Sequence, residues 1–143
     1  MSHHFDFSAL ERFSQATKSF DERAAAIISF HAALDHEMDI VLARFFEAPQ
    51  HLRRFGFGHK VDLVHAVTGE YTDRICAALA AFNDLRNSVG HGDAKDEVDK
   101  FQLKLFQRFV DVTEILNKEA SVPTSIDHVA AGLFGMLAGL RPR

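Results

Sequence analysis

Apolar side chains recur every three or four residues along most of the chain, and this spacing constrains the fold more than any other feature. In the segment 21–47, for example, Ile27, Leu34, Met38 and Val41 would lie on one face of a long helix. No stretch alternates apolar and polar residues as a half-buried strand does. The pattern is typical of an all-α protein.

Prolines, glycines and capping residues divide this pattern into helical segments. Pro49 and Pro123 lie between segments, and Asp21 can cap the second one. The sequence predicts a single all-α domain over residues 1–143, an up-and-down bundle of five to six helices. Its core would span about 20–118, followed by a Gly/Ala-rich helix within 122–140. We expect helices over about 8–20, 21–47, 60–67, 71–90, 97–118 and 125–140, with a loop over 49–58.

Composition agrees with a folded globule and limits the possible functions. The chain has 143 residues, 47% of them hydrophobic, and its 14 Phe residues predict a packed interior rather than a base-stacking surface. A net charge of −4 argues against a protein that coats nucleic acid, although a small RNA site remains compatible with it. The single cysteine, Cys76, excludes an internal disulfide and fits a reducing compartment.

No targeting segment or membrane span is predicted. The longest apolar run, 129–140, would extend only about 18 Å as a helix, which is too short to cross a bilayer. We therefore expect a cytoplasmic protein without a membrane partner.

The segment 85–92 carries the most distinctive chemistry. Arg86 is followed directly by Asn87, and His91 lies five positions after the arginine. An imidazole can move a proton near neutral pH, and a guanidinium can hold a phosphate through two hydrogen bonds. These groups are sufficient to cleave RNA without a metal.

Local geometry permits such a site without requiring it. Five helical steps place Arg86 and His91 about 140° apart, but Gly90 and Gly92 could end the helix and let the chain turn His91 back. A structural role is the alternative. Arg86 could pair with a carboxylate such as Asp84 or Asp93, and His91 could simply be favoured near a helix C-terminus.

The segment Arg86-Asn87-Ser88-Val89-Gly90-His91 resembles the motif of the HEPN superfamily, in which an arginine precedes a histidine by four to six residues. Its context is similar too: a long helix beginning Asp21-Glu22-Arg23-Ala24-Ala25-Ala26, then Phe57-Gly58-His59-Lys60-Val61-Asp62-Leu63, then a helix ending Asn83-Asp84-Leu85-Arg86-Asn87. This order resembles the branch around the mannitol-operon-repressor-like (MltR-like) proteins and covers about residues 20–118.

The resemblance implies a homodimeric helical bundle that acts as a metal-independent endoribonuclease and needs no cofactor. Two copies of the motif would meet in one composite cleft, with Arg86 and His91 as the catalytic pair and Asn87 as a polar helper. The expected partners are a second copy, RNA and, in a toxin–antitoxin or stress and defence context, an antitoxin or regulatory protein. Control by nucleotidylation is not expected, because Asp93 stands where some HEPN toxins carry a tyrosine.

The same resemblance supports a second hypothesis from another class. MltR-like relatives are linked to repression, so the chain could be a catalytically silent helical module. It would then bind a protein partner and regulate transcription or a stress response.

Other groups of residues are weaker candidates. His36-Glu37 begins like a zinc-protease helix but lacks the second histidine. Two sets of residues could each share a helical face and bind a metal, although a solvated face is the more common explanation. The first is His31 with Asp35 and Asp39, in which His31 can also pair with Asp35. The second is His59 with Asp62 and His65.

Two further features leave alternatives open. Lys60, Arg53 and Arg54 could supply cations to RNA or an acidic partner, or could be solubilising surface charge. In the last helix Ala131, Gly135 and Gly139 lie four apart, with Gly132 beside them, which predicts either close docking on its own core or a dimer contact.

Overall fold

The computed structural model describes residues 6–18, 21–116 and 125–143, and all regular structure in these ranges is helical. The all-α prediction is therefore confirmed. The predicted helix ends at 20 and 118, and residues 122–124, lie outside the described ranges. The elements are α1 (Phe7–Lys18), α2 (Ala24–Ala43), η1 (Pro49–Leu52), α3 (Phe57–Thr68), η2 (Glu70–Thr72), α4 (Asp73–Gly90), α5 (Lys95–Leu116) and α6 (Ile126–Ala138), where η marks a 3-10 helix.

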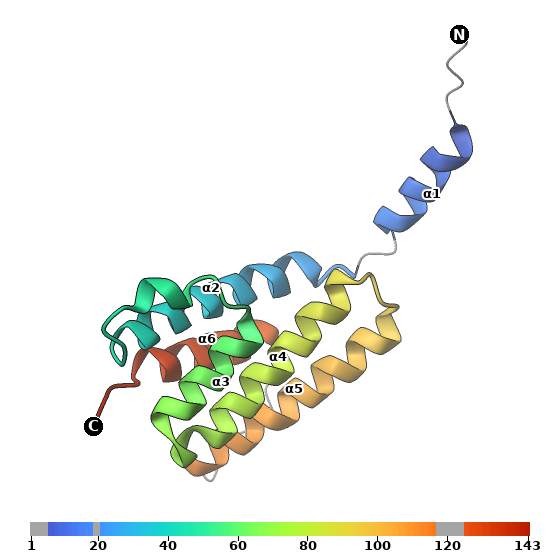
Figure 1. Ribbon diagram of the computed structural model, residues 1–143. Coiled ribbons are helices and arrows are strands. Elements are labelled where there is room, and N and C mark those ends of the chain that lie inside the picture. Colours follow the sequence, from blue (N-terminus) through green and yellow to red (C-terminus); the bar gives the residue numbers. More distant parts are fainter. Residues whose placement is uncertain (1–5, 19–20, 117–124) are drawn as a thin grey trace.

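Helices α2 to α6 form the bundle, and α1 projects away from it (Figure 1). Helix α4 is central, because it packs along α5 and also contacts α2, α3 and α6. Helix α2 in turn packs against α3 and α6. In α1, by contrast, the apolar side chains Leu10 and Phe13 are exposed.

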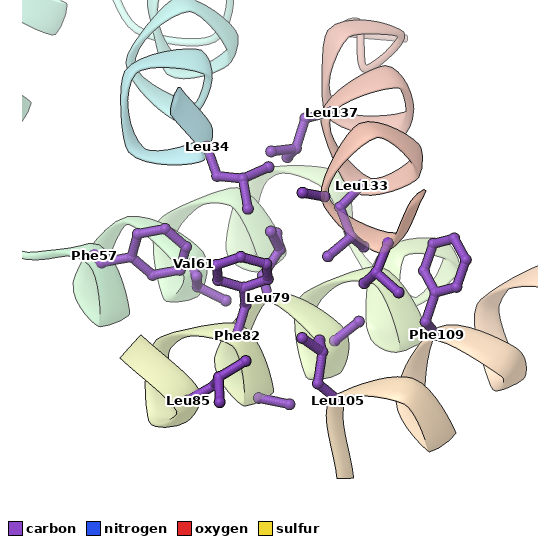
Figure 2. Packing of buried hydrophobic residues seen from close by; sticks show 14 of the residues in the cluster. Leu34, Phe57, Val61, Leu79, Phe82, Leu85, Leu105, Phe109, Leu133 and Leu137 are labelled. Carbon is purple, nitrogen blue, oxygen red and sulfur yellow. The ribbon is translucent and has the colours of Figure 1, made fainter. Parts of the chain in front are cut away.

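The buried core is built from the apolar positions at helical spacing. Leu34, Phe82 and Leu133, from three different helices, meet at its centre (Figure 2). Burying a phenylalanine such as Phe82 contributes roughly 2–3 kcal/mol. The prediction that phenylalanine fills the interior holds only in part, since Phe55 and Phe134 are exposed.

Several helix boundaries differ from those expected, and α2, for example, begins at Ala24 rather than at 21. Helix α2 ends at Ala43 rather than near 47. The next residue, Arg44, donates through Nη1 to the carbonyl oxygens of Ala138, the last residue of α6, and of Leu140. Helix α3 begins at Phe57 rather than at Lys60. The glycines around Phe57 suggested a loop, but this side chain is buried and helps draw the first turn of α3 onto the bundle.

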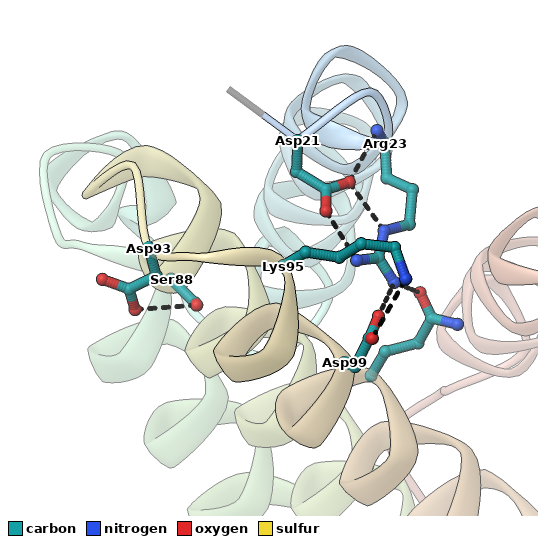
Figure 3. A network of polar contacts seen from close by, with 7 residues as sticks. Asp21, Arg23, Ser88, Asp93, Lys95 and Asp99 are labelled. Carbon is teal, nitrogen blue, oxygen red and sulfur yellow. Dashed lines mark hydrogen bonds and ion pairs between the residues drawn. The ribbon is translucent and has the colours of Figure 1, made fainter. Parts of the chain in front are cut away.

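The start of α2 is tied to α5 by a polar network (Figure 3). The Asp21 side chain accepts from the backbone N–H of Arg23 at 2.9 Å, but Arg23 is the N-cap residue of α2 and no side chain caps this helix, so the predicted capping by Asp21 is wrong. The Arg23 guanidinium binds Asp21 on one side and Asp99 of α5, at 2.8 Å, on the other. The hydrogen bond from Arg23 holds the pKa of the Asp21 carboxyl below its usual value.

The glycines of α6 serve different purposes. A Cβ on Gly132 would lie 2.6 Å from Cζ of Phe109, so the missing side chain leaves room on α6 for the Phe109 ring of α5. Docking on its own core is therefore confirmed at Gly132. A Cβ on Gly135 would meet no atom within 4 Å. The alternative, a dimer contact through this helix, stays a prediction.

Candidate functional site

The three motif residues lie at the C-terminal end of α4, on its outward side. Arg86 is half-buried, whereas Asn87 and His91 are exposed. Their positions follow from the inward side of the same helix, where Leu85 and Val89 are buried in the core. The core contacts of α4 thus direct the motif toward solvent.

A Schellman motif ends α4 and positions His91. The backbone N–H of Asp93 donates to the Ser88 carbonyl at 3.1 Å, and that of Gly92 donates to Val89 at 3.2 Å. Gly92 has a φ of 70°, which favours glycine. The buried Ser88 hydroxyl also donates to the Asp93 carboxylate at 2.8 Å (Figure 3). Asp93 is therefore occupied in closing the helix.

His91 is the C-cap residue and keeps a right-handed helical conformation, with φ −82° and ψ −5°. Of the two glycines expected to turn the chain, only Gly92 does so, because Gly90 still belongs to α4. Asn87 and His91, four residues apart, share a helix face, whereas Arg86 and His91 are about 140° apart. The chain does not turn His91 back toward Arg86 in the way that a one-copy site would need.

Arg86 lies along the last turn of its own helix. A Cβ on Gly90 would collide with Arg86 Nη1, so the glycine leaves room for the guanidinium. Within the described ranges, no hydrogen bond or ion pair engages the side chain of Arg86, Asn87 or His91. The alternative pairing of Arg86 with Asp84 or Asp93 is therefore not seen, and all three motif side chains can accept an outside partner.

His31 lies beside the motif, and the sequence patterns did not indicate this. Its Nε2 is 2.9 Å from Oδ1 of Asn83, which is one turn before Asn87 on α4. The imidazole stacks on Phe57 with ring centroids 4.0 Å apart. The expected pairing of His31 with Asp35 is wrong, because Asn83, 52 residues away, takes that place. No local spacing could have indicated so distant a contact.

Burial lowers the pKa of the His31 imidazole below its usual value of 6.5. The positive charge of Arg86 lowers it further, while the hydrogen bond to Asn83 acts in the opposite direction. His31 is therefore neutral at neutral pH. Since Asn83 Oδ1 can only accept, Nε2 of the neutral ring carries the proton.

Lys60 is not the exposed cation that the sequence suggested. The residue is only 1% exposed, and its Nζ lies 3.1 Å from both carboxylate oxygens of Asp35. Asp39 Oδ1 is 3.0 Å away and forms an ion pair without hydrogen-bond geometry. The carboxylates that were candidate metal ligands thus hold a buried lysine. Arg53 and Arg54 are exposed as expected.

A hollow of about 560 Å³ lies between the start of α3 and α4, and its last lining residue on α4, Asp84, precedes Arg86 by two positions. Its walls include Phe57 and Gly58 from α3, and Asn83 and Asp84 from α4. The side chain that holds His31 therefore also lines this space.

The remaining candidate sites have structural explanations. His65 pairs with Asp73 instead of joining His59 and Asp62. Across residues 6–18, 21–116 and 125–143, no group of three or more His, Cys, Asp or Glu residues could hold a metal ion. Cys76 is buried, as expected, and burial raises its pKa to about 11.

Comparison with protein-family models, with curated proteins and with solved structures gives no match for this chain. None of the helices in the described part of the chain has the length and apolar character needed to span a membrane.

Proposed function

We propose that this protein is a metal-independent endoribonuclease of HEPN type, with Arg86, Asn87 and His91 of two copies forming the site. The observation that carries this proposal is the state of the three side chains. They lie within six residues at the C-terminal end of α4, where a Schellman turn holds His91, and none makes a hydrogen bond or ion pair with another side chain of the described ranges.

The chemistry follows from the residue types. His91 accepts the proton of a ribose 2′-OH as its oxygen attacks the adjacent phosphorus, and the bond from phosphorus to the 5′-oxygen breaks. Arg86 stabilises the negative charge on the phosphoryl oxygens, and Asn87 holds one of them. The leaving 5′-oxygen takes up a proton from water, and His91 returns the proton that it accepted to the solvent. The products are a 2′,3′-cyclic phosphate and a 5′-hydroxyl, and no cofactor takes part.

Two copies are needed because of the angle between Arg86 and His91 on α4. A homodimer related by a two-fold axis can set the His91 of one copy opposite the Arg86 of the other. We place this dimer in the cytoplasm, in a toxin–antitoxin or stress and defence context, where a regulatory protein would restrain it.

Total RNA incubated with the purified protein and excess chelator tests the proposal. The wild type should cleave and leave cyclic phosphate ends, and His91→Ala should reduce the rate at least about 100-fold. His51→Ala is the matched control, because His51 is exposed in η1 and should leave cleavage unchanged. Equal background from all three folded proteins would contradict an enzyme.

A silent MltR-like module is the second candidate, and the charge of the chain favours it. The net charge is −4, and Asp84 and Asp93 flank the motif, so nonspecific attraction to phosphate is weak. Such a module would use the same exposed end of α4 to bind a regulatory protein. It would dimerise normally and show no His91-dependent cleavage.

A further inference from the structure

We propose that the hollow between α3 and α4 is a subsite for one nucleobase of the RNA strand, and that it takes bases with an exocyclic amino group in preference to uracil. This inference rests on the proposed function, because it adds a base-reading position to the same site. Its evidence comes from the hollow itself and from the side chains that line it.

The hollow offers one fixed hydrogen-bond donor. His31 Nε2 occupies Oδ1 of Asn83 at 2.9 Å, and the stack on Phe57 holds the imidazole in place. The amide nitrogen of Asn83 is then the group left for a ligand. It faces Gly58, where a Cβ would lie 3.8 Å from Nδ2. The absence of a side chain at Gly58 keeps the space in front of this donor open.

The hollow also offers two acceptors. The carboxylates of Asp62 and Asp84 line it, and neither makes a hydrogen bond or ion pair with any other described side chain. Two unshared carboxylates repel a phosphate group. They accept well from an amino group, however, as aspartate does from the exocyclic amine of cytosine. Charge therefore selects a base rather than a phosphate at this position.

The size and place of the hollow fit a base next to the cleaved phosphate. A volume of about 560 Å³ is ample for one base, and the buried Phe57, already stacked on His31, forms part of the wall. Asn83 precedes Asn87 by one helical turn, a rise of about 6 Å. A strand whose phosphate lies at Arg86 can place a neighbouring base there, splayed out of the stack as in other single-strand RNA sites.

Short oligonucleotides with one ribonucleotide at the cleavage position test the subsite. Each base flanking that position is varied among A, C, G and U, and the cleavage rate is measured. The wild type should cleave the best amino-bearing base about tenfold faster than uracil at one flank. Asn83→Ala and Asp84→Asn should each reduce this preference to about twofold or less. Asp127→Asn, an exposed carboxylate on α6, should leave it unchanged.

Binding of all-deoxy versions, measured by fluorescence anisotropy, separates this inference from the proposed function. Base-dependent binding that Asn83→Ala removes, without any cleavage by the wild type, would sustain the subsite and overturn the ribonuclease. Cleavage with equal rates for all four bases, or a preference unchanged in both variants, would overturn the subsite alone. Neither binding nor cleavage would overturn both. Asp84→Asn, which is nearly isosteric, keeps the test valid if Asn83→Ala unfolds.

Discussion

At the scale of single residues, His31 links the stability of the fold to pH. Its pKa in the folded protein is lowered mainly by burial, so the unfolded chain binds the proton more tightly. The neutral ring contributes its full stability above pH 6.5, and this contribution is lost as the pH falls from 6.5 toward the lowered pKa.

This sign predicts the behaviour of His31→Gln. A glutamine can still donate to Asn83 but has no proton to gain. The free energy of unfolding of the variant should therefore fall less between pH 6.5 and pH 5 than that of the wild type. Urea unfolding at several pH values measures the difference. A steeper fall in the variant would contradict the environment described for His31.

Lys60 is a buried cation paired with two carboxylates, so its charge should be costly to remove. In Lys60→Met, Asp35 and Asp39 would face each other without their cation, and we expect a loss of about 3 kcal/mol in the free energy of unfolding. Lys100 is the control, because its pair with Glu97 is exposed. Lys100→Met should change stability by less than about 0.5 kcal/mol, and equal effects would argue against a buried pair.

At the scale of elements, α6 separates two uses of glycine. Gly132→Ala should destabilise the fold by about 1–3 kcal/mol, because the new methyl group must displace the Phe109 ring. Gly135→Ala should instead stabilise it by up to about 1 kcal/mol, since alanine favours the helix and its Cβ meets nothing. Thermal unfolding of the two variants measures both effects. A destabilising Gly135→Ala would indicate that another surface covers this face.

The helices themselves were largely predictable, because their evidence is local. The spacing of Ile27, Leu34 and Met38 places the buried face of α2, and Gly92 marks the end of α4. The start of α3 was missed because Phe57 is held by tertiary contacts that no neighbouring residue reveals. A lysine is normally found at the surface, and for this reason Lys60 was expected there. Its burial depends on Asp35 and Asp39 of another helix, which spacing along α3 does not reveal.

In the candidate site, too, features that depend on local sequence could be predicted, whereas those that depend on contacts between helices could not. Arg86, Asn87 and His91 lie within six residues of one another, so their position at the end of α4 could be predicted. The contact of His31 with Asn83 joins two helices, and the hollow beside it is formed by α3 and α4 together. Neither follows from spacing along one segment.

At the scale of the whole molecule, the proposed activity depends on two copies. The bundle displays the motif at the C-terminal end of α4, yet one copy holds Arg86 and His91 about 140° apart around the helix axis. The proposed activity therefore requires Arg86 of one copy to act with His91 of the other.

Mixing two inactive variants tests this claim most directly. Arg86→Ala and His91→Ala are purified separately, unfolded, mixed in equal amounts and refolded, and RNA cleavage is measured in the presence of chelator. Half of the dimers should be mixed, and each mixed dimer carries one intact Arg86–His91 pair across the interface, so about a quarter of wild-type activity should return. Activity no higher than that of either variant alone, although mixed dimers form, would contradict a site shared between two copies.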